Sequence, residues 1–179
     1  MACIKKLDVD ITYDCANLGF PGGTGEIDEA IIINSSDIST ISETGGVGTI
    51  TMLTGKKGYV VNSVNNSVMY QDAIKANDTV PAAEDQSVVI KMLSSMDKTA
   101  YRSAVSKMLG GNFRVALKSK YENYYLAGAF CGLEASDMAT DSSTGGITTV
   151  TLKTPEASTG DRLVVISKET YDGLKIPKI

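Results

Sequence analysis

The chain has 179 residues, with 17 Lys and Arg against 21 Asp and Glu, a net charge of -4, and no His or Trp. The lack of His excludes His-based nucleophilic triads and His-ligated metal centres, and a pI near 4.9 argues against a basic nucleic-acid-binding surface. The length and the 42% hydrophobic content predict one domain, residues 1–179, with a substantial core.

The chain carries no pattern for membrane insertion or export. Its longest apolar run, at residues 30–34, is far shorter than the roughly 18 residues of a membrane span. The sequence MACIKKLDVDITYDC has no extended apolar segment and no cleavage pattern. We therefore expect no signal peptide and synthesis in the cytoplasm. The three cysteines, Cys3, Cys15 and Cys131, are odd in number and widely spaced, which is typical of reduced thiols.

Alternating apolar and polar residues predict strands in most of the first half. The segment at residues 27–40 is apolar on both faces at its centre, which indicates a strand buried on both sides. Residues 16–26 and 76–86 are predicted loops, and Asn65-Asn66 is the predicted turn of a hairpin. The strands predicted here cover residues 4–13, 27–40, 47–53, 58–64, 67–74 and 87–93.

A single helix is predicted at about residues 97–109. Asp97 is a suitable N-cap, and Gly110-Gly111 supplies the stop. Apolar residues recur at helical spacing on one face, so the helix should pack against a sheet. These residues are Ala100, Tyr101, Ala104, Val105, Met108 and Leu109.

Strand patterns resume after the helix. The predicted strands cover residues 113–119, 124–138, 147–154 and 162–168, and the tail at residues 171–179 is predicted to be extended because it contains Pro177. The sum is a mainly β chain, a β-sandwich or partly closed barrel with one central helix packed on it.

An internal repeat relates the two halves at a shift of 100 residues. Residues 36–54 and 136–154 are identical at ten of nineteen positions, and four more positions exchange similar apolar residues. Coincidence in a Ser/Thr/Gly-rich chain is the alternative, but composition does not fix the register of the matched apolar positions. Each copy predicts a strand, a Thr-Gly-Gly turn and a return strand, and therefore a duplicated β-hairpin.

No pattern of catalytic chemistry stands out. The Gly-rich loops lack the spacing of phosphate- or dinucleotide-binding sites. Two groups of carboxylates suit a hard cation such as Ca²⁺, but they lack the spacing of a calcium loop, so we predict solvated strand faces. We expect no catalytic residue, no cofactor and no metal, and the chain is not predicted to be an enzyme. The two groups are Asp8, Asp10 and Asp14, and Glu134, Asp137 and Asp141.

A cluster of Tyr and Lys at residues 118–125 is the best candidate for ligand stacking. Tyr121, Tyr124 and Tyr125, with Lys118 and Lys120, could hold a base or a sugar. Tyrosines at a strand edge or at a subunit interface are the alternative, which the acidic composition favours.

The order of these elements resembles the bacteriophage tail-tube (major tail) protein family. The helix DKTAYRSAVSKML lies just past the middle of the chain, ANDTVPAAEDQ corresponds to the long loop, and GAFCGLEASDMATDSSTGGITTVTLKT occupies the place of the C-terminal hairpin. The resemblance implies a non-enzymatic virion subunit that forms rings, commonly hexameric, which stack into a tube. Its partners would be copies of itself and neighbouring tail or connector proteins, with DNA only as non-specific cargo in the lumen.

Two classes of alternative stay open at this point. One is a head–tail connector, tail-completion or capsid-decoration protein, and the other is a carbohydrate-binding β-sandwich module that uses the Tyr cluster. For the tail-tube expectation, the candidate contacts between subunits lie in the N-terminal segment, the 76–86 loop and the Tyr cluster. These candidates are Ile4, Leu7, Val9, Asp78, Val80, Pro81, Glu84, Asp85, Tyr121, Tyr124 and Tyr125.

Overall fold

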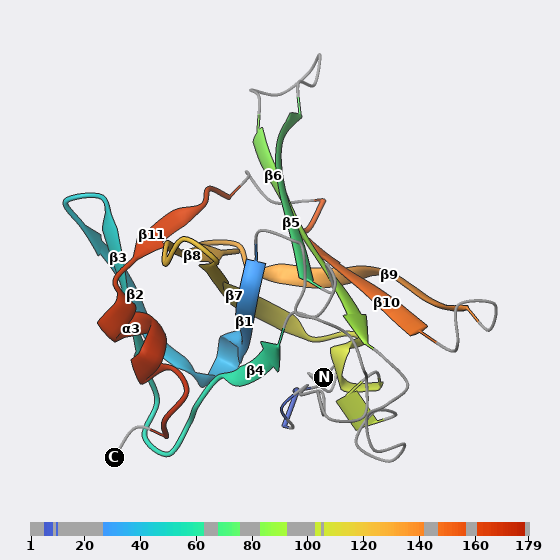
Figure 1. Cartoon of the computed structure of the whole chain (residues 1–179), viewed down its shortest axis with the longest axis horizontal. Helices are drawn as coiled ribbons and strands as arrows, with labels where there is room; N and C mark the ends of the chain where they lie inside the picture. The colour runs from blue at the N-terminus through green and yellow to red at the C-terminus, as the bar shows by residue number, and fades with distance from the viewer. Residues whose placement is uncertain are drawn as a thin grey trace.

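A computed structural model describes residues 6–8, 10, 27–62, 68–75, 83–92, 103–104, 106–141, 147–156 and 161–177. Their fold is mainly β, as predicted, with a large mixed sheet that does not close into a barrel (Figure 1). The sheet order is β2-β3-β11-β8-β7-β9-β10-β6-β5, and β1 joins β7 to β4. The strands are β1 (Ile27–Asn34), β2 (Ile38–Thr44), β3 (Val47–Met52), β4 (Tyr59–Asn62), β5 (Val68–Lys75), β6 (Ala83–Met92), β7 (Asn112–Ser119), β8 (Tyr124–Ala127), β9 (Leu133–Asp141), β10 (Ile147–Lys153) and β11 (Val164–Ile166).

Strands β1 and β7 form a central layer that is covered on both faces. Ala30 and Ile32 of β1 face a first core, together with residues such as Val88 and Val150. Ile31 and Ile33 face a second core on the other side of the layer. All four β1 side chains are fully buried. The apolar run therefore forms a strand buried on both sides, as its lack of alternation predicted.

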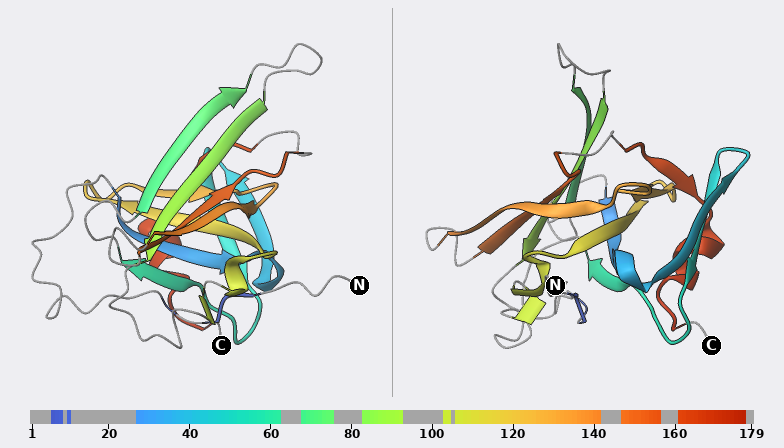
Figure 2. Two further views of the ribbon diagram at one scale, coloured as in Figure 1. Left: turned by 90° about the vertical axis from the view of Figure 1, so that its right-hand side faces the viewer. Right: turned by 180° about the vertical axis from the view of Figure 1, so that it is seen from behind.

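The sheet divides into two wings at β7. One edge of β7 pairs with β8 over residues 115–118 and with β9 over residues 112–113. From β8 the first wing continues through β11 and β3 to β2, and it curls around the second core. From β9 the second wing continues through β10 and β6 to β5, and it covers the first core (Figures 1 and 2).

The C-terminal segment forms a short helix, α3 (Lys168–Gly173), inside the first wing. Ser167 is its N-cap, and the Ser167 hydroxyl accepts a hydrogen bond from the Thr170 amide at 3.1 Å. Tyr171 and Leu174 are buried in the second core. The predicted extended tail is therefore wrong for these residues, because Pro177 lies beyond the end of the helix and does not interrupt it.

The predicted central helix is helical where the structure describes it, at residues 103–104 and 106–108. Ala104 and Met108 are fully buried in the first core, as its apolar face predicted. Leu109 is 44% exposed, so its assignment to that face is wrong. It precedes Gly110, where a positive φ of 75° ends the helical path. Residues 97–102 lie outside the described part of the chain.

Five strand predictions need correction. The predicted strand at residues 27–40 is two strands, because a 3-10 turn at Ser35–Asp37 separates β1 from β2. The predicted strand at residues 4–13 is not a strand at residues 6–8 and 10, because the backbone of Leu7 bonds the Asn34 side chain in place of a strand partner. β4 pairs with β1 and β5 pairs with β6, so the predicted β4–β5 hairpin around Asn65-Asn66 is wrong. β6 begins at Ala83, so the last residues of the predicted 76–86 loop belong to a strand. The predicted strand at residues 124–138 is two strands, because a turn between Gly128 and Gly132, both with positive φ, separates β8 from β9.

Both copies of the repeat form the predicted antiparallel strand pairs, β2–β3 and β9–β10, but in different registers. The predicted Thr-Gly-Gly turn of the second copy, residues 144–146, lies outside the described residues. Thr44 opposes Val47 in the first copy, whereas Asp141 opposes Ile147 in the second. In both hairpins the pairing register shifts by one residue at the same place in the return strand, between residues 51 and 52 in the first copy and between residues 151 and 152 in the second. The return strands are thus equivalent, while the first strands are displaced by three residues. An odd displacement reverses the faces of the matched side chains.

Candidate functional site

Among the residues that the structure describes, the two ends of the sheet, β2 and β5, are free edges. In the part of the chain that the structure describes, β2 pairs only with β3 and β5 pairs only with β6. The two strands are similar in length, with seven and eight residues. A free edge presents a row of unpaired N–H and C=O groups, which is a ready template for another strand. These edges are the most prominent candidate site for interaction.

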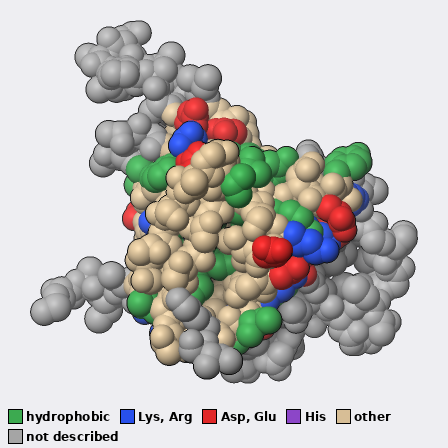
Figure 3. Space-filling model, turned by 90° about the vertical axis from the view of Figure 1, so that its left-hand side faces the viewer, with side chains coloured by type: hydrophobic (Ala, Val, Ile, Leu, Met, Phe, Trp, Pro, Cys, Tyr) green, Lys and Arg blue, Asp and Glu red, His purple; other side chains and the backbone are tan. Residues whose placement is uncertain are grey.

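The β2 edge is polar on one face and apolar on the other. Ser39, Thr40, Ser42 and Thr44 are exposed, whereas Ile38 and Ile41 are half-buried against the second core. Figure 3 views the molecule from the side where β2, β3 and α3 lie, and acidic and basic side chains gather there in separate groups, at the top and at the right of the view.

The β2–β3 turn fixes which backbone groups of β2 point outward. Gly45 and Gly46 have φ of 62° and 83°, the signs of a two-residue type I′ turn. In such a hairpin the flanking pair, Thr44 and Val47, is hydrogen-bonded, and bonded and non-bonded pairs alternate along the ladder. The Glu43 amide therefore points away from β3, towards the free edge.

The β5 edge is carried on a hairpin arm that rises from the rest of the sheet (Figure 2). Buried Gln86 of β6 fixes the arm to the body, because its Oε1 accepts from the Gly128 amide at 2.8 Å. Its Nε2 donates to the Tyr70 hydroxyl of β5 at 3.1 Å, which joins the two strands of the arm. The backbone of Gln86 also exchanges hydrogen bonds with Thr154. The side-chain oxygen and the backbone of Gln86 thus tie the base of the arm to the rest of the sheet.

A third edge, that of β4, is covered by the N-terminal segment, residues 6–8 and 10. Asp10 accepts a hydrogen bond from the Val60 amide at 3.0 Å and forms an ion pair with Lys57 at 3.2 Å. Its carboxylate occupies the position that a neighbouring strand would need. Of the three sheet edges in the described residues, β4 is therefore blocked, and β2 and β5 are open.

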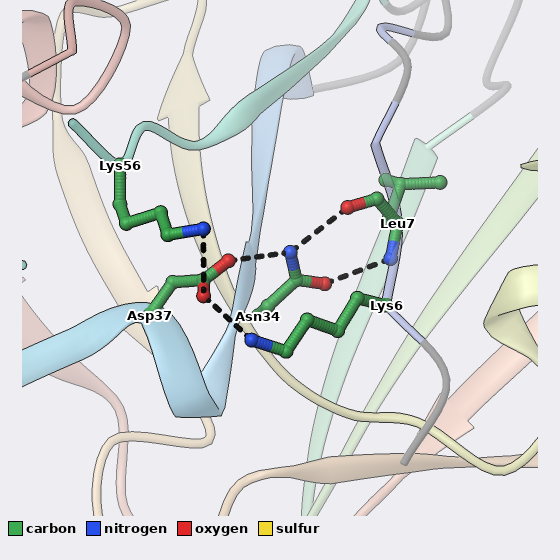
Figure 4. A network of polar contacts seen from close by, with 5 residues as sticks. All are labelled: Lys6, Leu7, Asn34, Asp37 and Lys56. Atoms are coloured by element: carbon green, nitrogen blue, oxygen red, sulfur yellow. Dashed lines mark hydrogen bonds and ion pairs between the residues drawn. The ribbon is translucent and has the colours of Figure 1, made fainter. Parts of the chain in front are cut away.

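Asn34, the last residue of β1, also binds the N-terminal segment (Figure 4). Its Oδ1 accepts from the Leu7 amide and its Nδ2 donates to the Leu7 carbonyl, both at 2.9 Å, so the side chain replaces a strand partner. Nδ2 also donates to Asp37 Oδ2 at 2.9 Å. The Leu7 side chain is 1% exposed within the first core.

Asp37 is the charged centre of this network. Its carboxylate is 3% exposed and lies 2.9 Å from Lys6 Nζ and 3.9 Å from Lys56 Nζ. Burial by itself would raise the pKa of Asp37, but the hydrogen bonds from Lys6 and Asn34 and the charges of Lys6 and Lys56 outweigh it. The pKa is therefore lowered from its ordinary value, and Asp37 is ionised at neutral pH.

A groove of about 400 Å³, lined by apolar side chains and by Thr51, Glu169 and Thr170, lies between β3 and the C-terminal segment. Ile50 and Met52 of the second core form one side of it, and Leu174, Ile176 and Pro177 line the other. In the β2–β3 ladder Ile50 is paired with Ile41, and paired residues share a face of the sheet. The groove therefore lies on the same face as the half-buried side of β2.

The Tyr cluster does not form a stacking platform. Tyr124 is 7% exposed and packs against Tyr171, with ring centroids 5.1 Å apart. Tyr125 follows it in β8 and faces the first core. Tyr121 is 79% exposed and lies in the turn before β8. Successive residues of a strand point to opposite faces, so the predicted joint surface of the three rings is wrong. Lys118 forms an ion pair with Asp28 at 3.5 Å.

The other predicted contact residues fall into three groups. Leu7 and Tyr124 are buried within their own chain, so their side chains are not accessible to a neighbouring subunit. Glu84 is exposed, and Asp85 is half-buried and forms an ion pair with Lys153 at 3.3 Å. The remaining candidates lie outside the described residues: Ile4, Val9, Asp78, Val80 and Pro81.

The predicted carboxylate groups are distributed among separate contacts. Asp8 forms an ion pair with Lys107 and Asp10 with Lys57, while Glu134 accepts a hydrogen bond from Asn112 at 3.3 Å. Asp14 lies outside the described residues. Over those residues, no group of three or more His, Cys, Asp or Glu side chains is arranged to hold a metal ion. No described helix is long and apolar enough to cross a membrane.

Asn34, Gln86 and the free edges were not identified from the sequence. Asn34 follows a buried apolar run, and Gln86 was placed in a loop, so neither carried a recognisable motif. The Ser/Thr alternation of β2 is the one local signal of an exposed strand.

Comparisons with protein-family models, with curated proteins and with solved structures found no match to this chain. The candidate site is therefore defined by the geometry of this chain.

Proposed function

We propose that this chain is a structural subunit that joins copies of itself edge to edge, through β2 of one copy and β5 of the next, into rings. The observation that carries the proposal is that the sheet begins and ends in open edge strands of matched length, within the described residues. Because β2 and β5 are different strands, the contact is heterologous. Heterologous contacts generate closed rings or helical filaments, whereas an isologous contact closes as a dimer.

The rings of this proposal stack into a phage tail tube in a virion, with neighbouring tail or connector proteins as further partners. The composition suits a conduit for DNA, because a Ser/Thr-rich chain with a net charge of -4 does not attract phosphate groups. The exposed residues of β2 are Ser and Thr, which supports the same role. DNA then passes through the lumen as cargo and is not bound by sequence.

A matched pair of substitutions at Glu43 tests the use of the β2 edge. Pro at this position removes an amide that points towards the free edge, and edge strands tolerate Pro where the N–H faces outward. Both Glu43→Pro and Glu43→Ala remove the 2.5 Å ion pair with Arg162. Both variants therefore lose the Glu43 charge. Only Glu43→Pro also loses the backbone N–H of residue 43 and gains the proline ring.

We expect Glu43→Ala to assemble and Glu43→Pro to remain monomeric in light scattering and negative-stain electron microscopy, with similar circular dichroism spectra. A Glu43→Pro variant that assembles like the unmodified chain would argue against pairing through β2. An unmodified chain that stays monomeric at high concentration would contradict the proposed function itself. Rings that never stack would instead favour the connector alternative.

A further inference from the structure

An apolar row crosses the first wing and stops at the free edge of β2. Ile50 of β3 is paired with Ile41 of β2, and both belong to or pack against the second core. Ile50 is 8% exposed, whereas Ile41 and its neighbour Ile38 are only half-buried. The next position in this row would lie on a strand added to β2, about 5 Å away. No described residue of the same chain occupies it.

A matching apolar row ends at the free edge of β5. Met69 of β5 is paired with Val89 of β6. Met69 is 40% exposed, and both side chains line a surface hollow of about 340 Å³ on the arm. Val68 and Tyr70 point the other way, into or against the first core of their own chain. The Met69 face is therefore the open face of this strand.

We propose that β5 of one copy pairs with β2 of the next with its Met69 face turned inward, so that Met69 packs beside Ile38 and Ile41. The opposite orientation would bring the body of the incoming copy, which lies under Val68 and Tyr70, against α3 and the groove of the receiving copy. The interface then has one continuous apolar row, from Val89 and Met69 of one copy to Ile41 and Ile50 of the other. This inference rests on the proposed function and specifies the interacting faces.

Paired cysteines test the orientation and the head-to-tail contact together. Side chains opposite each other on neighbouring strands have Cα atoms about 4.5–5.5 Å apart, within the range that a disulfide spans. We therefore consider two double variants, Met69→Cys with Ile41→Cys and Met69→Cys with Ile38→Cys. Controls are the two single variants at Met69 and Ile41, and the unmodified chain for its native cysteines, all under the same mild oxidation.

We expect at least one double variant to give a covalent ladder of multiples of the chain on a denaturing gel, with no ladder from the single variants. Dimers from Met69→Cys alone would show an isologous contact and overturn the inference. An assembled protein in which neither double variant gives a ladder would overturn the inference and leave the proposed function standing. A protein that does not assemble at all overturns both.

Charge substitutions give a second readout that does not depend on the register. We expect Met69→Asp to raise the concentration needed for half-assembly at least tenfold, because the row would then bury an unpaired carboxylate. Met69→Leu should assemble within about twofold of the unmodified chain. Leu109→Asp is the control, since Leu109 is 44% exposed and lies outside both rows. An assembling Met69→Asp variant, or equal loss in the Leu109→Asp control, would contradict the inference.

Discussion

Replacement of Asn34 by Ala is expected to be one of the most destabilising single changes to a polar residue in this chain. The substitution removes three hydrogen bonds of 2.9 Å, two with the Leu7 backbone and one with the Asp37 carboxylate. Asn34 and Asp37 are each 2% exposed, so water does not easily replace the lost partners. Each buried group left without a partner costs about 1–3 kcal/mol, and we expect a total loss of about 4 kcal/mol.

Thermal and urea unfolding followed by circular dichroism measure this loss. In a chain of this size 4 kcal/mol corresponds to a fall in melting temperature of about 12 °C. Asn123→Ala is the matched control, because Asn123 is exposed in the turn before β8, and we expect a change within about 0.5 kcal/mol. Hydrogen exchange adds a local readout, since the Leu7 amide should be protected in the unmodified chain and should exchange rapidly in Asn34→Ala.

A loss below about 1 kcal/mol for Asn34→Ala, with the Leu7 amide still protected, would refute this reasoning. It would mean that Asn34 does not hold the N-terminal segment. The coverage of the β4 edge by Asp10 would then need another explanation.

Three further predictions concern pH and backbone geometry. The pKa of Asp37 is lowered, so its contribution to stability is present above the unfolded pKa and should be lost below about pH 4; Asp37→Asn should remove this acid dependence in a denaturation series. Burial, with the nearby Glu29 carboxylate, raises the pKa of Tyr171, so stability should fall above about pH 10, and Tyr171→Phe should flatten that fall. Gly132→Ala should destabilise more than Gly110→Ala, because both glycines have positive φ but a Cβ at Gly132 would clash with the Asn112 side chain, whereas a Cβ at Gly110 would meet open space; equal melting temperatures would contradict this contact.

Strands could be predicted from sequence where their own pattern of apolar and polar residues shows which faces are buried. The run at residues 30–33 has no alternation, and β1 is indeed covered on both faces. In β10 apolar and polar residues alternate from Thr149 to Lys153, and burial alternates with them. In these strands the pattern of side chains determines which faces can be buried, whichever strands lie alongside.

Pairing partners and registers could not be predicted in the same way. Proximity in sequence suggested a β4–β5 hairpin, but β4 completes the central layer beside β1. The repeat predicted two equivalent hairpins, yet the first strand of the second copy is displaced by three residues. Partner choice depends on long-range packing, which single-strand patterns do not contain.

The candidate site was largely invisible in the sequence. Tyr124 and Tyr125 suggested a ligand surface because they are adjacent aromatic residues, and adjacency in a strand places them on opposite faces. A free edge is a property of the whole sheet, since it depends on which strands remain unpaired once the others have found partners. The Asn34 network likewise joins residues that are distant in sequence: Leu7 lies 27 positions from Asn34, and Lys6 lies 31 positions from Asp37.

The most direct test of edge-to-edge assembly is the mass and shape of the purified chain in solution across a wide range of concentrations. Light scattering should give a mass that is an integer multiple of 18.9 kDa, and electron microscopy of the same sample should show rings or stacked tubes. A mass of 18.9 kDa at every concentration, with no rings or tubes, would contradict assembly through β2 and β5.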